Sequence, residues 1–143
     1  MQPMTRVVLL LSLCAAAVAC ASSPRTPVTT PDPDRVERLI GMWDARDGAA
    51  FIEVGSSLSE ALVEAPDDFF VAMSAHPSSF DSWLSALPES TFTAYASERL
   101  PAIAALLPAM RSAAARFRHH VRYGAMATQL SERLSVITIR EID

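Results

Sequence analysis

The stretch "PDDFFVAMSAHPSSFDSWLSAL", which runs from residue 66 to residue 87, decides the fold. It divides at Pro77 into two 11-residue units that align with each other. Each unit places an aromatic residue and, four positions later, an aliphatic residue on one helical face: Phe69 and Met73, then Phe80 and Leu84. Proline is tolerated in the first turn of a helix and ends the helix before it. We therefore predict two short helices that pack their apolar faces inward, with Trp83 also in the core.

A third segment, "PESTFTAYASERL" (residues 88–100), carries Phe92 and Tyr95 in a pattern shifted by one residue. It predicts a third short helix of the same kind, and chance similarity is the alternative. A unit of 11 residues is shorter than the periods of about 20 residues and above that build solenoids. The pattern therefore indicates a compact helical arrangement and not an extended array.

Two amphipathic helices are predicted before this stretch, the first capped by Asp32 and the second by Asp47. The apolar face of the first is formed by Val36, Leu39, Ile40 and Trp43. That of the second is formed by Phe51, Val54, Leu58, Leu62 and Ala65. Both sets recur at helical spacing, so they indicate helices with one buried face.

Two more helices are predicted after residue 100. The first begins at Pro101, and Pro108 inside it predicts a kink or break near residues 104–108. Its buried stripe is predicted to comprise Met110, Ala114, Phe117 and Val121. Gly124 ends it, and a last helix from about residue 125 is predicted to bury Met126, Leu130 and Leu134. The segment "SVITIREI" (residues 135–142) is β-branched; with no partner strand visible, we favour helix or fraying over a strand.

These elements predict an all-α domain over residues 34–143, a compact bundle of about five to seven short helices punctuated by proline. Abundant alanine and only four glycines agree with a helical fold. A chain of this length builds one domain.

The N-terminal residues have the pattern of an export signal. Arg6 precedes an apolar run from residue 7 to residue 19, which is too short to span a bilayer as a helix. The run ends in Ala17-Val18-Ala19-Cys20. Small residues followed at once by cysteine resemble the lipobox of bacterial lipoproteins, although leucine is usual where Ala17 stands. The alternative is export without a lipid, with cleavage after Ala19 or Ala21.

The resemblance implies that residues 1–19 are a signal peptide and that the Cys20 thiol carries a diacylglycerol, with acyl chains such as palmitate. Cys20 would then be the new N-terminus and would hold the protein on its membrane. Ala21, in place of an aspartate that retains such proteins at the inner membrane, implies the periplasmic face of the outer membrane. Residues 20–33, rich in Pro, Ser and Thr, are expected to form a disordered tether.

Charge is distributed unevenly along the domain. Residues 32–98 hold 13 acidic side chains against three arginines, whereas residues 99–143 hold seven arginines against three acidic side chains. Four cations, Arg111, Arg116, Arg118 and Arg122, fall within 12 residues that contain no acidic side chain. They are candidate binding residues for an acidic partner or for anionic lipid head groups. The alternative is that they are solvated or face the acidic residues Glu60, Glu64, Asp67 and Asp68.

No constellation of catalytic residues is visible. The three histidines, His76, His119 and His120, do not have the spacing of a metal site, and no phosphate loop or nucleophile motif occurs. We therefore predict no enzymatic activity, no cofactor and no metal. An exported, acidic chain is also not expected to bind nucleic acid.

Two functions remain open on the sequence. The first is a membrane-anchored envelope lipoprotein whose helical domain is a non-enzymatic interaction or adaptor module for another envelope protein. The second is a module that binds lipid or a small apolar ligand, with its arginine-rich helix on anionic head groups.

Overall fold

The two aligned proline units fold as consecutive helices, α3 (Pro66–Ala75) and α4 (Pro77–Ser90), in a computed structural model that describes residues 32, 34–48 and 50–142. Each helix carries proline in its first turn, and His76 alone separates them. The backbone N–H of His76 donates to the carbonyl of Met73, and its Nε2 lies 2.9 Å from a carboxylate oxygen of Glu37. The corner is thus closed by one residue, as the proline spacing predicts.

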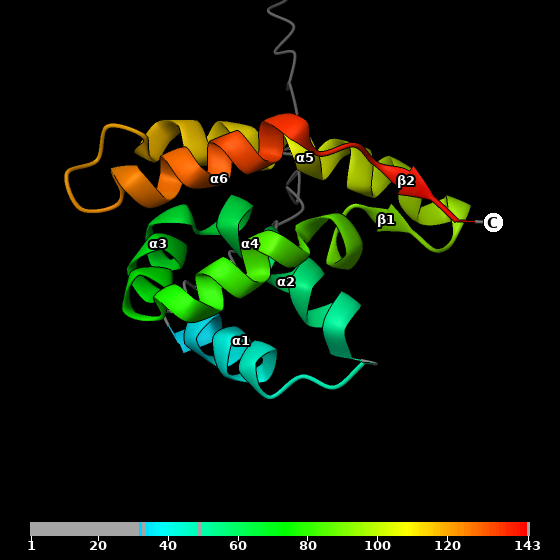
Figure 1. Cartoon of the computed structure of the whole chain (residues 1–143), viewed down its shortest axis with the longest axis horizontal. Coiled ribbons are helices and arrows are strands. Elements are labelled where there is room, and N and C mark those ends of the chain that lie inside the picture. The colour runs from blue at the N-terminus through cyan, green and yellow to red at the C-terminus, as the bar shows by residue number, and fades with distance from the viewer. Residues whose placement is uncertain (1–31, 33, 49, 143) are drawn as a thin grey trace, which may run out of the picture. The chain divides into compact units, whose positions relative to one another are not determined.

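The described residues form six α-helices, so the predicted all-α class is confirmed. The other elements are α1 (Asp34–Asp44), α2 (Ala50–Glu64), β1 (Thr93–Ala94), the 3-10 helix η1 (Ser97–Arg99), α5 (Leu100–Phe117), α6 (Gly124–Val136) and β2 (Arg140–Glu141). Figure 1 shows α5 and α6 side by side along one face, with α1 to α4 packed beneath them. Cys20 and the predicted tether, apart from Asp32, lie outside the described residues.

An aromatic cluster fills the centre of the bundle. The Trp83 ring centroid lies 5.2 Å from that of Phe69 and 6.1 Å from that of Phe80, and all three side chains are buried. Leu58 of α2 is fully buried in the same core, whereas Phe51 is half-buried against Trp43. The predicted inward face of α4 is therefore confirmed.

Helices α2 and α4 approach most closely at Gly55. A β-carbon there would lie 2.5 Å from the β-carbon of Ser90, which is far inside van der Waals contact. The Gly55 carbonyl accepts hydrogen bonds from the hydroxyls of Ser59 and Thr91 and from Nε1 of Trp83. This close approach requires glycine, and the buried hydroxyls satisfy one another and the helix backbone.

The predicted caps of α1 and α2 are confirmed. A carboxylate oxygen of Asp32 accepts from the backbone N–H of Asp34, and one of Asp47 accepts from that of Ala50. A hydrogen bond from the Arg38 guanidinium lowers the pKa of Asp32 from its ordinary value. The caps thus fix where the two helices start.

The third proline segment does not form a third helical unit, so that prediction was wrong. Pro88 lies inside α4, which continues to Ser90, and the chain then forms β1 and η1. The ring of Pro88 removes the N–H that would donate to the carbonyl of Leu84. Arg133 of α6 donates to that carbonyl instead, at 3.3 Å. A contact from a distant helix therefore allows α4 to pass through proline.

The helix or frayed end favoured for residues 135–142 was also wrong. Helix α6 ends at Val136, and Arg140–Glu141 pairs in parallel with β1, in the register of Thr93 with Arg140 and Ala94 with Glu141. The partner strand comes from the segment that was predicted to be helical. The break predicted near residues 104–108 does not occur, because α5 continues from Leu100 to Phe117 through Pro108.

Candidate functional site

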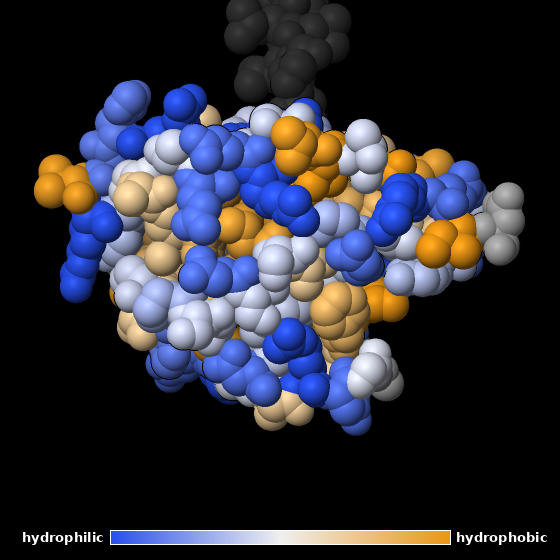
Figure 2. Space-filling view, in the orientation of Figure 1, coloured by the Kyte–Doolittle hydropathy of each residue, from blue (hydrophilic) through white to orange (hydrophobic). Residues whose placement is uncertain are grey.

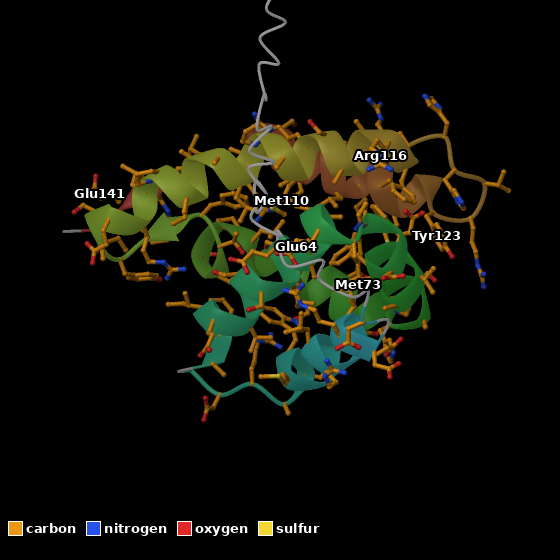
Figure 3. The ribbon with its side chains drawn as sticks, turned by 180° about the vertical axis from the view of Figure 1, so that it is seen from behind. Glu64, Met73, Met110, Arg116, Tyr123 and Glu141 are labelled. Atoms are coloured by element: carbon orange, nitrogen blue, oxygen red, sulfur yellow. The ribbon has the colours of Figure 1, made fainter. Side chains whose placement is uncertain are left out.

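The loop between α5 and α6 projects from one end of the described unit (Figure 1). We define residues 116–123 as the basic loop; it includes the last two residues of α5 and the turn that follows. The space-filling view shows an apolar projection at this end, bordered by hydrophilic surface (Figure 2). Figure 3 shows Arg116 and Tyr123 at this end and Glu141 of β2 at the opposite one.

The buried side of the basic loop fixes its backbone. Phe117 and Tyr123 are buried, and their rings lie 4.6 Å and 6.2 Å from the ring of Phe70 in α3. The backbone N–H of Gly124 donates to the His120 carbonyl at 2.8 Å. A β-carbon at residue 124 would lie 2.8 Å from the carbonyl oxygen of Arg118, so the return of the chain requires glycine.

His120 holds the turn through its ring. The ring stacks on Tyr123 with centroids 4.5 Å apart, and Nδ1 lies 3.2 Å and 3.3 Å from the backbone nitrogens of Arg122 and Tyr123. Because a backbone N–H only donates, Nδ1 is the acceptor of both hydrogen bonds. His120 is thus part of the frame of the loop, a role that its sequence position did not indicate.

Val121 is exposed at the tip of the basic loop. The sequence predicted it in a buried stripe with Met110, Ala114 and Phe117; these three are buried, but Val121 has a relative exposure of 105%. The prediction was wrong because α5 ends at Phe117, four residues before Val121. An aliphatic side chain that is wholly in water gains nothing from the fold.

Three of the four candidate arginines belong to the basic loop. Arg116, Arg118 and Arg122 are exposed, and their guanidinium groups make no hydrogen bond or ion pair with any residue that the structure describes. The guanidinium carbon of Arg122 lies 5.9 Å from the ring centroid of Tyr123. These cations remain available to a partner.

Arg111 is engaged elsewhere. Its Nε and Nη2 donate to the carbonyl of Leu134, at 3.2 Å and 2.8 Å, and so satisfy a backbone group in the last turn of α6. Leu134 lies at the end of α6 that is remote from the basic loop. The structure therefore does not bring Arg111 to the other three arginines, and we assign it to helix capping.

The acidic residues considered as partners do not meet the loop. Glu64 forms an ion pair with Arg35 of α1. Within the described part of the chain, no ion pair joins the basic loop to Glu60, Glu64, Asp67 or Asp68. No acidic residue occurs between Glu98 and Glu132, so α5, the loop and the first half of α6 are free of negative side chains.

A surface hollow of the described unit combines one acidic and one basic side chain with neutral ones. It has a volume of about 360 Å³ and is lined by Asp81, Leu84, Ser85, Gln129 and Arg133. The Arg133 guanidinium there is occupied by the carbonyls of Leu84 and Ser85. The residues that the structure describes also hold no group of His, Cys, Asp or Glu side chains placed to bind a metal ion. None of their helices is long and apolar enough to cross a membrane.

The chain matches no family model, no curated protein and no solved structure in comparisons with known proteins.

Proposed function

We propose that this protein is a lipid-anchored, non-enzymatic helical module of the bacterial cell envelope and that the basic loop is its contact surface. The main support for the proposal is that the loop exposes cations and one apolar side chain together. Arg116, Arg118 and Arg122 are exposed and unpaired among the described residues, and Val121 stands between them in solvent. Side chains that the fold leaves without partners are the ones available for recognition.

The sequence before the domain supports the anchored half of the proposal. An apolar run of signal length ends at Ala17-Val18-Ala19-Cys20, a pattern that resembles bacterial lipoprotein signals. A diacylglycerol on Cys20 would hold the domain close to a membrane, at the periplasmic face of the outer membrane. Anchoring raises the effective concentration of nearby binding partners without any new contact. A weak loop contact therefore suffices for a module tethered in this way.

Two further surface hollows lack the lining that is usual for a ligand pocket. The hollow beside η1, of about 300 Å³, combines Glu60 and Arg99 with small side chains. A second one, also of about 300 Å³, is lined by Arg46, Asp47, Gly48 and Phe51. Ligand pockets usually join a mainly apolar lining to a few converging polar groups. The basic loop is therefore a stronger candidate for the contact surface than these two hollows.

The anchor is tested by metabolic labelling of the full chain with a clickable fatty acid. We expect Cys20→Ala to abolish labelling and leave an unprocessed precursor. Cys14→Ala, which removes the other cysteine of the signal region, is the matched control and should keep its label. Undiminished labelling of Cys20→Ala would contradict the anchored half of the proposal.

The contact surface is tested separately, by placing a photo-crosslinking benzophenone amino acid at Val121 or at Val136 of the full chain in cells. Both valines are exposed, and Val136 lies at the other end of α6. We expect a defined adduct, with lipid or with one protein, from position 121 only. Equal adducts from both positions, or none from position 121, would show that the basic loop is not the contact surface.

A further inference from the structure

We propose that the surface bound by the basic loop is an anionic lipid membrane, with its arginines on lipid phosphates and Val121 inserted among the head groups. This inference rests on the proposed function and names the partner of the same site. Guanidinium groups match phosphate oxygens in geometry and charge. An exposed aliphatic residue beside cations is typical of segments that lie at a membrane interface.

The isolation of Val121 favours lipid over a protein partner. A stable protein interface buries roughly 800 Å² on each side around an apolar centre. In Figure 2 the apolar projection at this end is bordered by hydrophilic surface. The other large apolar side chains that are exposed lie outside the basic loop: Met42, Val71, Tyr95, Val136 and Ile142. Val121 is thus a single apolar tip with cations at residues 116, 118 and 122, too small for a protein interface and suited to shallow insertion.

The frame beneath the loop presents this tip without a large loss of conformational freedom. The stacked rings of His120 and Tyr123 and the hydrogen bonds to Nδ1 of His120 hold the turn before any partner arrives. Tyr123 is in turn packed against Phe70 of α3. Such preorganisation reduces the entropy that binding must offset.

The distribution of charge orients the domain toward a negative surface. Thirteen of the 16 acidic residues lie between residue 32 and residue 98, while residues 99–131 contain none. An anionic membrane therefore attracts the exposed arginines of the basic loop and repels the acidic residues of α1 to α4. The negative charge at the start of α1 is partly neutralised, because Asp32 pairs with Arg38.

The place where the described chain starts agrees with this orientation. Figures 1 and 3 show α1 beginning toward the end of the molecule from which the basic loop projects. A lipid on Cys20 would tether the domain through the start of α1.

The inference is tested on the chain from residue 20 onward with Cys20→Ser, so that no acyl chain contributes. The buried apolar residues of the described part of the chain lie between residues 36 and 137, all after the position of the acyl group. We expect this chain to co-sediment with vesicles that contain phosphatidylglycerol, to release as salt rises, and to ignore phosphatidylcholine vesicles.

Two pairs of matched variants sharpen the test. Arg118→Gln should weaken binding to phosphatidylglycerol vesicles by about fivefold, since each near-surface charge contributes on that scale. Arg99→Gln, the same change of charge outside the loop, should not. Val121→Ser should weaken binding roughly threefold or more, and Val136→Ser should leave it unchanged. Unchanged circular dichroism would show that all four variants keep the fold.

Equal co-sedimentation with both vesicle types, or with neither, would overturn the lipid inference. In that case a protein adduct from the benzophenone at position 121 would leave the proposed contact surface standing, with an acidic protein as its partner. Vesicle binding together with unlabelled Cys20 would instead contradict the anchor alone.

Discussion

The corner between α3 and α4 and the corner between α5 and α6 both connect consecutive helices, but they differ in which side chains they leave exposed. The first corner consists of His76 alone. The ring of His76 pairs with Glu37, and the aromatic residues of the helices before and after it are buried. The second uses the basic loop, whose buried side is as well packed as the first corner. Its outer side, in contrast, presents three unpaired cations and an exposed valine.

The difference separates residues that stabilise the fold from residues that do not. At the α3–α4 corner, apolar area is buried and the histidine has a partner, so most substitutions there should lower stability. The outer side of the basic loop contributes almost nothing to folding. Residues of that kind are free to serve binding, and the predictions below test this division.

The largest effect is expected at the aromatic core beside the first corner. Trp83→Ala should lower the free energy of unfolding by about 3–5 kcal/mol, because a fully buried indole and its bond to the Gly55 carbonyl are lost. Urea denaturation followed by circular dichroism measures the change. Tyr95→Ala, at a half-exposed aromatic side chain, is the control and should cost much less. Equal losses in the free energy of unfolding would mean that Trp83 is not part of the buried core.

An intermediate effect is expected where α2 meets α4. Gly55→Ala should destabilise the domain by about 1–3 kcal/mol, since the new β-carbon collides with Ser90 and approaches Trp43. Gly41→Ala in α1 is the matched control: nothing lies within 4 Å, so better helix propensity should stabilise by up to about 1 kcal/mol. Thermal melts of both variants measure these changes in stability. Similar shifts with the same sign would contradict the close approach.

The smallest effect is expected on the outer side of the basic loop. Replacing Arg116, Arg118 and Arg122 together by glutamine should change the free energy of unfolding by less than about 0.5 kcal/mol, because these side chains have no partners among the described residues. Urea denaturation at low and high salt is the measurement. A loss above 1 kcal/mol would show that the arginines stabilise the fold and would blur the contrast between the two corners.

Much of the fold could be predicted from the sequence because its signals are local. Proline spacing placed α3 and α4, and Asp32 and Asp47 marked the starts of α1 and α2. Helical periodicity also identified buried residues such as Trp83 and Leu130. Each of these signals depends only on residues within one or two turns.

The failures depended on contacts between distant segments. Nothing near Pro88 indicates that Arg133 supplies the missing donor to Leu84, so the helix was predicted to end before Pro88. The strand at Arg140 likewise needs its partner at Thr93. At the candidate site the cations were visible in the sequence, but the exposure of Val121 was not. The apolar residues keep their helical spacing past the end of α5, so the spacing placed Val121 in the buried stripe. Only the charged residues around Val121 indicated that it is exposed.

The bond from Arg133 to the Leu84 carbonyl has a consequence for the order of folding. It joins residues 49 positions apart, and it compensates for a donor that Pro88 cannot supply. Local contacts form before distant ones, because closing a long loop costs chain entropy. The last turn of α4 should therefore become stable only after α5 and α6 have paired and brought Arg133 into place. Pro88 should thus couple the completion of one helix to the docking of another.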